Sequence, residues 1–499
     1  MTSHLIILII AIPLLGAFLL PLLNKFGKRI KYFWLATVLG LTDIFSFFLY
    51  LLIIEKGEVV YTLGAKFPLL VSPQGFPIRI ILEADALSGF LSFIFLSIIF
   101  LIFIYSLKIL SNYSFLDKFY VLYLLLTVGI LGFLFTGDFF TLFVFYEISS
   151  ITTAGLIAFF RSEECFKSAF HYLSLFAVGS LFLLFGIGIL YSEYGFLNMG
   201  IIAKVLQFSF LDKVALSLIA SSLLLKAGVF PFYFWKPEAY KVSPISAILL
   251  SIISSLSAIY ILFRIFLGVF GVNLIFGWIL ILFSIFSIFM GIFLAIKENN
   301  IKKILAYLAI SELGYIILGI SSGIVMLNND FGFKAIQGGL FHMVNDILDI
   351  GLLFLIIGVV IYITKSKNVL EIRGFGHKYP WLAGFFLLGV FAISGMPPLN
   401  GFASKIIIYE SVFHLSPVLT IIGILGSILI LAILIKIFAI IFLGISPEKY
   451  QPVPKTAMAV IFVFAILMIS IGLFPGQFTS FFINPAAEAL VSQQNYICK

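Results

Sequence analysis

Residues 382–412 read LAGFFLLGVFAISGMPPLNGFASKIIIYESV. The stretch is apolar and long enough to cross a bilayer, which takes roughly 20 such residues. Gly395, Pro397 and Pro398 interrupt it, because proline removes a backbone donor and glycine loosens the helical turn. Lys405 follows the interruption, at a depth where a charge costs at least ~3 kcal/mol. The stretch therefore predicts a membrane helix in two pieces, broken beside a buried lysine.

A second stretch of the chain has the same character. Residues 226–231 read KAGVFP, and two further prolines follow at 237 and 244. Broken helices at corresponding places in the two halves of a transporter mark its transport site. The two breaks are five predicted helices apart, so we expect two five-helix repeats, helices 4–8 and 9–13, broken at Pro231, Pro237, Pro397 and Pro398. The alternative is that both breaks are kinks needed only for packing, since prolines are common in membrane helices.

The composition predicts an all-α polytopic membrane protein. Of 499 residues, 62% are hydrophobic and 10% charged, which excludes an ordinary soluble domain of this size. The basic residues behind the net charge of +8 are scattered through short loops, so we expect no nucleic-acid partner. The two cysteines, Cys165 and Cys498, lie far apart and no cofactor motif occurs. We therefore expect no metal, no bound cofactor and no catalytic site in the chain itself.

The apolar runs divide the chain into helices and larger units. The first run has no basic leader and no small-residue cleavage site, so it predicts a first helix and not a signal peptide. The larger units expected are residues 1–110 (helices 1–3), 111–268 (the first repeat), 269–445 (the second repeat) and 446–499 (helix 14 and the tail). The fourteen predicted helices lie near 5–23, 33–54, 83–107, 119–136, 139–160, 168–190, 212–230, 243–267, 272–296, 303–323, 335–362, 381–396 with 402–412, 416–444 and 456–474.

The distribution of basic residues tests this map. Of 30 Lys and Arg residues, 19 fall in loops after odd-numbered helices, among them Lys236 and Lys302. Seven fall in loops after even-numbered helices or in the tail. A miscounted helix would destroy this alternation. The positive-inside rule therefore predicts that the odd loops face the cytoplasm and that both termini lie outside the cell membrane.

Ten charged residues fall inside predicted helices. Each is costly at mid-bilayer unless it faces another charge or water within the bundle. Together they predict a line of buried charge that moves protons or cations. The ten are Asp43, Glu147, Lys226, Arg264, Glu312, Asp346, Asp349, Lys405, Glu410 and Lys436.

Glu147 and Lys226 are expected to pair between helices 5 and 7. Desolvation would keep a lone glutamate neutral at that depth, whereas a neighbouring lysine keeps both groups charged. Such a pair can act as a switch that responds to protons nearby. The alternative is a static ion pair that only fixes helix packing.

Helix 11 carries a polar stripe. His342, Asp346 and Asp349 recur at three- and four-residue steps and so share one face. A lone membrane histidine usually only packs, but a histidine beside carboxylates suits a proton relay because it titrates near neutrality. Lys405 is the best candidate for the terminal proton carrier. The further candidate relay residues are His171, Glu312, Asp346, Asp349, Glu410 and Lys436.

Several motifs at these residues carry a family resemblance. The chain resembles the antiporter-like subunits shared by respiratory complex I, Mrp-type Na+/H+ antiporters and the membrane arms of energy-converting hydrogenases and sulfur reductases, and it is most similar to the Mrp D-type subunits. The resemblance covers about residues 80–445. It implies fourteen helices, inverted repeats and a half-channel from each side. It also implies that Glu147 and Lys226 are the helix 5–helix 7 pair, that His342 is the helix-11 histidine and that Lys405 is the helix-12 lysine. The motifs are FTGD (135–138), FYEIS (145–149), LKAGVFPFYFW (225–235), PISA (244–247), KKILAYLAISELGY (302–315) and GMPPLNGFASK (395–405).

The chain departs from the family pattern in the middle of the relay. The histidine and lysine usual in helix 8 align with Leu250 and Leu256. The second histidine and lysine of helix 11 align with Asp346 and Ile350, and the helix-6 lysine aligns with His171. Either water and the helix-8 serines bridge this gap, or the path is interrupted there.

These observations favour an ion-translocating subunit of a multi-subunit membrane complex that moves H+, Na+ or both. The alternative is a structural or coupling subunit of such a complex that has lost complete translocation. A self-sufficient antiporter is disfavoured because the family resembled works in assemblies. The expected partners are other membrane subunits, lipids and, in a redox-driven complex, peripheral iron–sulfur or nickel–iron subunits.

Overall fold

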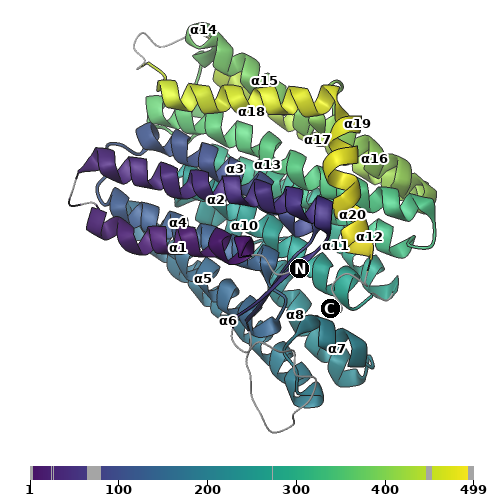
Figure 1. The fold of residues 1–499 in the computed structure, drawn as a ribbon. Coiled ribbons are helices and arrows are strands. Elements are labelled where there is room, and N and C mark those ends of the chain that lie inside the picture. Colours follow the sequence, from purple (N-terminus) through teal and green to yellow (C-terminus); the bar gives the residue numbers. More distant parts are fainter. Residues whose placement is uncertain are drawn as a thin grey trace.

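A computed structural model of the chain describes residues 4–23, 25, 27–63, 80–271, 274–444 and 452–492, which include every predicted site residue. The domain boundary predicted at 445/446 lies outside these residues. Long helices lie side by side in one bundle (Figure 1). The prediction of an all-α polytopic membrane protein is confirmed.

The helices of the first half have the following bounds in chain order. They are α1 (Leu5–Leu23), α2 (Lys28–Lys56), α3 (Ala86–Ile109), α4 (Leu116–Phe135), α5 (Phe139–Ile157), α6 (Glu163–Tyr194), α7 (Met199–Val205), α8 (Phe210–Ala227), α9 (Trp235–Val242) and α10 (Ile245–Phe263), which a π-helical turn continues over Arg264–Val269.

The second half follows in the same way. Its helices are α11 (Leu274–Lys297), α12 (Ile301–Val325), α13 (Asp330–Thr364), α14 (Phe375–Lys378), α15 (Pro380–Ile393), α16 (Asn400–Leu415), α17 (Pro417–Phe442), α18 (Lys455–Leu473), α19 (Pro475–Phe478) and α20 (Asn484–Val491), with a π-helical turn over Thr479–Ile483.

Twelve helices of the described chain are long and apolar enough to cross a membrane. The pairs α8/α9 and α15/α16 are not among them. Each pair corresponds to one of the two helices predicted to be broken. The predicted number of fourteen is therefore reached only if each pair is counted as one crossing.

Both breaks occur where the sequence places its glycines and prolines. Helix α8 ends at Ala227, because Gly228 adopts a left-handed conformation (φ 66°) that glycine tolerates best. Helix α15 ends at Ile393, and Gly395 is likewise left-handed (φ 75°). Pro237 was predicted to lie in a break but lies in the first turn of α9, where a proline removes no helical hydrogen bond.

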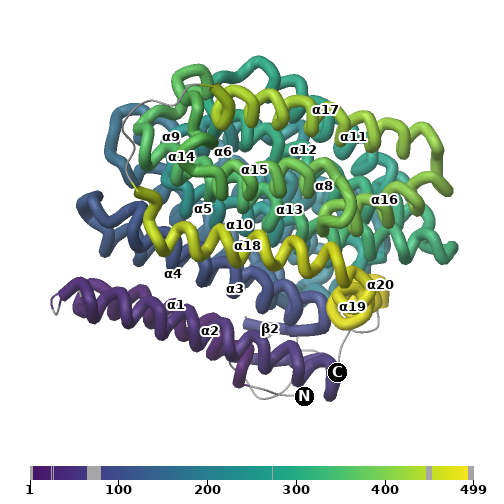
Figure 2. Tube along the Cα trace, turned by 90° about the horizontal axis from the view of Figure 1, so that it is seen from above, coloured from purple at the N-terminus to yellow at the C-terminus, as the bar shows by residue number. Residues whose placement is uncertain are grey.

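Helices α10 and α13 form the interior of the bundle. Every residue of α10 from Ile245 to Phe263 is buried, whereas α1 and α2 bury only a minority of their residues. Figure 2 shows α1 and α2 along one edge, with α10 and α13 behind further layers of helices. Residues 338–360 of α13 are likewise all buried, so charges on these parts of α10 and α13 must be stabilised inside the protein.

A two-stranded hairpin closes one end of the bundle. Strands β1 (Val59–Leu63) and β2 (Ile80–Ala84) are antiparallel, and Asp138 at the start of α5 accepts a hydrogen bond from the backbone of Ile81 at 3.0 Å. Asp85, directly after β2, forms a buried ion pair with Arg264. Arg264 also donates to the carbonyl of Ala489 in α20 at 3.1 Å. The hairpin, the end of α10 and the last described helix are thus tied together at one point.

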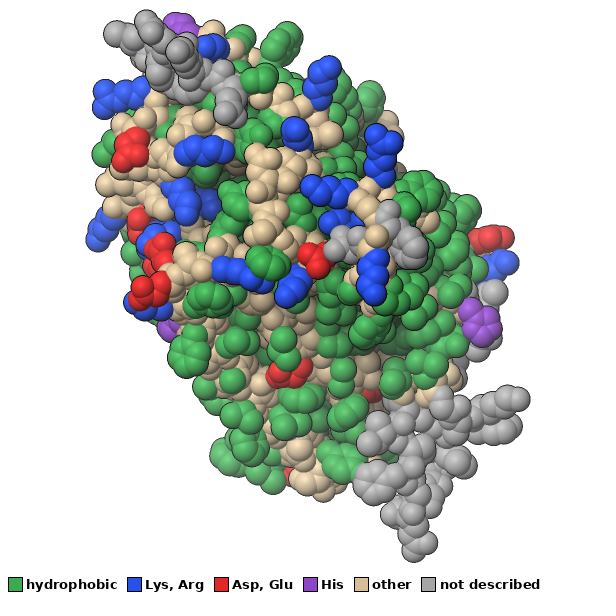
Figure 3. Space-filling model, turned by 90° about the vertical axis from the view of Figure 1, so that its left-hand side faces the viewer, with side chains coloured by type: hydrophobic (Ala, Val, Ile, Leu, Met, Phe, Trp, Pro, Cys, Tyr) green, Lys and Arg blue, Asp and Glu red, His purple; other side chains and the backbone are tan. Residues whose placement is uncertain are grey.

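The opposite end of the bundle is basic. Lys and Arg side chains gather over the upper part of the face shown in Figure 3. Positive charge is therefore concentrated on this face of the molecule.

Glu83 in the hairpin gives the protein a predicted pH dependence. Burial raises its pKa to about 8 from the ordinary 4.5; Arg264 opposes this shift and the acidic Asp85 adds to it. Between these two values the folded protein holds a proton that the unfolded chain releases, so the contribution of Glu83 to stability is greatest below pH 4.5 and falls as the pH rises to about 8. Glu83→Gln is expected to flatten this fall when thermal unfolding is followed from about pH 5 to about pH 9. Parallel curves for the two proteins would contradict the assignment.

Candidate functional site

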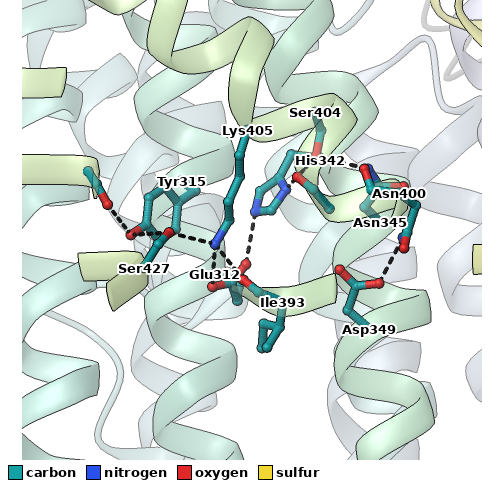
Figure 4. A network of polar contacts seen from close by, with 12 residues as sticks. Glu312, Tyr315, His342, Asn345, Asp349, Ile393, Asn400, Ser404, Lys405 and Ser427 are labelled. Atoms are coloured by element: carbon teal, nitrogen blue, oxygen red, sulfur yellow. Dashed lines mark hydrogen bonds and ion pairs between the residues drawn. The ribbon is translucent and has the colours of Figure 1, made fainter. Parts of the chain in front are cut away.

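Glu312 lies at the centre of a buried charged cluster. Its carboxylate, on α12, is 3.1 Å from the ammonium of Lys405 on α16 and 3.0 Å from Nε2 of His342 on α13 (Figure 4). The contact with His342 is within ion-pair distance but is not aligned as a hydrogen bond. All three side chains are at most 1% exposed. Residues from three helices, far apart in the sequence, thus share one carboxylate inside the bundle.

The break between α15 and α16 supplies further partners for Lys405. The ammonium donates to the carbonyl of Ile393 at 2.7 Å, which is free because the last carbonyls of a helix have no intrahelical partner. It also donates to Ser427 of α17 at 3.1 Å and lies 4.1 Å from the centre of the Tyr315 ring. The charge is therefore held by a carboxylate, a helix end, a hydroxyl and an aromatic face.

A chain of hydrogen bonds runs from this cluster to Asp349. Nδ1 of His342 is 3.0 Å from the hydroxyl of Ser404, to which Asn345 donates at 2.8 Å. Asn345 also donates to the backbone carbonyl of Asn400 at 2.8 Å, and the Asn400 amide donates to Asp349 at 2.7 Å. Figure 4 shows these side chains between α13 and α16. They form one polar network that starts at Glu312 and ends at Asp349.

The polar stripe of α13 lies entirely within the protein. His342, Asn345, Asp346 and Asp349 are all 0% exposed. Within the described chain, neither carboxylate oxygen of Asp346 has a hydrogen-bond partner, and one oxygen of Asp349 also has none. Buried acceptors without partners are costly. A proton, a water molecule or a cation is expected to reach them.

Lys226 forms the corresponding centre in the first half. Its ammonium, in the last turn of α8, donates to Ser150 of α5 at 3.0 Å and contacts Tyr172 of α6 at 3.5 Å. The ring of Phe176 lies 4.8 Å away. The side chain is 2% exposed. As in the second half, a buried lysine lies beside a helix break.

The expected direct pair of Glu147 with Lys226 is not made. Among the described residues no ion pair joins them, although their charges act on each other through space. Glu147 is only partly buried. The ammonium instead contacts Ser150, one helical turn further along α5. The sequence placed both residues at similar depth but did not fix the rotation of α5.

Three of the candidate relay residues lie outside both clusters. His171 is exposed on α6, and Lys436 is exposed on α17. Glu410 forms a surface pair with Lys334 at 3.8 Å, with side chains 56% and 49% exposed. The predicted helices are present, but these positions point away from the interior.

Two buried lysines were assigned to loops by the sequence. Lys236 in α9 is 1% exposed, and Lys302 at the start of α12 is 3% exposed and donates to the carbonyl of Ser243 at 2.6 Å. The signal that could have identified Lys236 is its place in the second piece of a broken helix, which must return into the bundle to complete the crossing.

The chemistry available to these groups is proton exchange and charge pairing. Among the described residues, no group of three or more His, Cys, Asp or Glu side chains is arranged to hold a metal ion. The cluster instead places a carboxylate, an imidazole and an ammonium in contact, away from bulk solvent. Such groups titrate as a unit, so a proton that enters at one of them changes the charge state of all.

Comparison with known proteins gives a family and related folds. Residues 136–431 match the family model described as NADH:quinone oxidoreductase/Mrp antiporter, TM. The chain is 27% identical to the D-type subunit of the Na+/H+ antiporter of Bacillus subtilis, over 99% of both chains. This relative has essentially the same length, so the similarity is not confined to one part of the chain.

Two solved structures share the fold. A chain of the membrane-bound sulfane sulfur reductase, an archaeal respiratory membrane complex, superposes with a TM-score of 0.86 at 24% identity, covering 99% of both chains. A chain of the Mrp complex from Dietzia sp. superposes with a TM-score of 0.87 at 22% identity, covering 99% of this chain and 98% of that one. At these identities the matches establish the architecture of the bundle.

Proposed function

The chain belongs to the NADH:quinone oxidoreductase/Mrp antiporter transmembrane family, and from that premise we propose that it carries protons, alone or in exchange for Na+, as one subunit of a larger membrane complex. The relative from B. subtilis is named as part of a Na+/H+ antiporter, and both solved neighbours are chains of complexes. These relatives support both the ion and the multi-subunit assembly.

The observation that carries the proposal is the buried contact of Glu312 with Lys405 and His342. An isolated structural ion pair needs only two partners, whereas here one carboxylate is shared by two bases beside a broken helix. If a proton reaches Glu312, the attraction of its carboxyl group for Lys405 and His342 falls. The contacts of Glu312 with these two bases can then open or rearrange. A protonation step at one end of the network therefore acts on the other end.

We also propose the arrangement of the chain in the membrane. The basic end in Figure 3 would face the cytoplasm of a plasma membrane, which places both termini outside. Residues 111–268 and 269–445 would be inverted copies, because each contains one broken helix with a buried lysine beside the break. Lipids and other membrane subunits would cover the outer apolar faces. Peripheral iron–sulfur or nickel–iron subunits would be present only in a redox-driven assembly.

A coupling subunit without complete translocation is the second candidate. The uncharged central helix α10 favours it, because no carboxylate, histidine or lysine on that helix links Lys226 to the cluster around Glu312. The two candidates make opposite predictions for variants in the first half. Only a complete path requires Lys226 for transport.

Lys226→Ala is therefore expected to reduce proton movement roughly tenfold or more, because a positioned proton carrier contributes at least this much. The complex that contains this chain would be reconstituted into liposomes, and internal pH would be followed with a fluorescent dye. Proton movement would be driven by a Na+ gradient if the complex is an antiporter, and by the redox substrates if it is a respiratory complex.

Lys213→Ala is the matched control, because Lys213 lies on the same helix but is exposed. It is expected to transport like the wild type. Normal transport by the Lys226 variant in an intact complex would favour the coupling role instead.

A further inference from the structure

The middle of the bundle separates the two charged clusters. Helix α10 packs against α8, which carries Lys226, and against α12, which carries Glu312. Its polar side chains from Ile245 to Phe263 are serines and one tyrosine. A proton that passes between the halves must cross this region. A charged side chain that carries the proton across this region must therefore lie on a helix other than α10.

Lys236 is the charge that the fold brings to this region. The chain returns into the bundle at α9, and the stem of Lys236 packs so closely on Gly228 that a Cβ there would lie 2.6 Å from the lysine Cε. The side chain is 1% exposed. Among the described residues its ammonium has no hydrogen bond or ion pair, and the ring of Trp235 lies 5.7 Å away. An ammonium buried in this way requires a nearby negative charge.

Asp346 supplies that negative charge from the other half. Its carboxylate on α13 is fully buried, and neither oxygen has a hydrogen-bond partner in the described part of the chain. Lys236 and Asp346 act on each other electrostatically without direct contact. Asp346 also interacts with Glu312 and Lys405. Asp346 therefore interacts with Lys236 in the first half of the protein and with Glu312 and Lys405 in the second half.

Polar groups and a small cavity connect this pair to the first half. Tyr240 of α9 donates to Ser251 of α10 at 3.4 Å and interacts electrostatically with Asp346. A cavity of about 10 Å³, close to the smallest that holds one water molecule, is lined by Tyr240, Ser251 and Thr153. Thr153 lies one turn along α5 from Ser150, which accepts the hydrogen bond of Lys226. One water in this cavity would extend the polar contacts from α5 to α9.

We propose that Lys236 and Asp346 form the proton relay that joins the two halves of the protein, in place of a charged residue on α10. In the forward step the Lys236 ammonium gives a proton through water to the Asp346 carboxylate, leaving a neutral amine and a neutral acid. Asp346 then passes the proton to the network of Glu312 and His342, and Lys236 takes up the next proton from the first half. This inference rests on the proposed translocation function and names its central residues.

A double replacement separates a relay from a static pair. Lys236→Met and Asp346→Leu each leave the other charge buried and uncompensated, whereas the double variant removes both and is expected to assemble normally. If the pair is a relay, each single variant and the double variant lose roughly tenfold or more of the proton movement in the reconstituted complex. Assembly would be followed by size-exclusion chromatography and thermal unfolding. Lys241→Met is the matched control, because Lys241 lies on the same helix but pairs with Glu164 at the surface.

Three outcomes decide the proposal. Full assembly of the double variant without proton movement supports the relay. Restored proton movement in the double variant, or wild-type movement in Lys236→Met, overturns it and leaves a packing pair. If Lys236→Met is active while Lys226→Ala and Lys405→Ala are inactive, only the relay fails; if all of them are active, the proposed translocation function fails as well.

Discussion

Lys405→Ala is expected to abolish proton movement by the assembled complex, a loss of roughly 100-fold or more. Its ammonium contacts Glu312, the end of α15 and Ser427 at the same time. Alanine leaves these acceptors without a cation and removes the group that exchanges protons beside the break. Proton uptake into liposomes, measured with the same amount of assembled complex, tests this expectation.

Lys436→Ala is the control for this experiment. Lys436 is also a lysine within a membrane helix, but it is exposed on α17 and lies outside the charged cluster. Its replacement is expected to leave transport near the wild-type rate. Equal losses in both variants would mean that the assay reports general damage to the bundle, and transport by the Lys405 variant at the normal rate would exclude Lys405 as a carrier.

Glu312→Ala is expected to reduce both stability and transport. Removal of one partner from a buried charged cluster typically costs about 3–5 kcal/mol, because the remaining charge is left without compensation. Here Lys405 would lose its carboxylate, and His342 would lose its only ion-pair partner among the described residues. Thermal unfolding of the purified complex would show a lower midpoint, and proton movement would be lost.

Glu410→Ala provides the comparison for stability. Its pair with Lys334 is exposed, and exposed pairs contribute only about 0–1 kcal/mol. The midpoint is expected to change little. A Glu312 variant as stable as the Glu410 variant would show that the cluster is not held by the ion pairs described, and that other groups compensate the charge of Lys405.

Much of the fold follows from apolar runs and helix breakers. The run at 5–23 has the bounds of α1, because an apolar run of membrane length has few other stable structures. The predicted helix 7 ran three residues past Ala227, where Gly228 ends α8. The breaks near Pro231 and Pro398 were located because glycine and proline act locally on the backbone.

The site was less predictable, because a sequence does not give the rotation of a helix or its neighbours. The spacing of His342, Asp346 and Asp349 correctly placed them on one face. It could not reveal that Glu312, on another helix, is the carboxylate that Lys405 and His342 share. Spacing alone also gave no means of separating these residues from His171, whose face of α6 turns outward.

The tie between Asp85, Arg264 and Ala489 has a consequence for biosynthesis. A ribosome adds Asp85 179 residues before its partner Arg264, and Arg264 acquires the carbonyl of Ala489 only 225 residues later. Early helices are therefore inserted while the hairpin still lacks its counter-charge, and the last helix completes the contact. A nascent chain released before α20 would keep an incompletely bonded guanidinium at that end of the bundle.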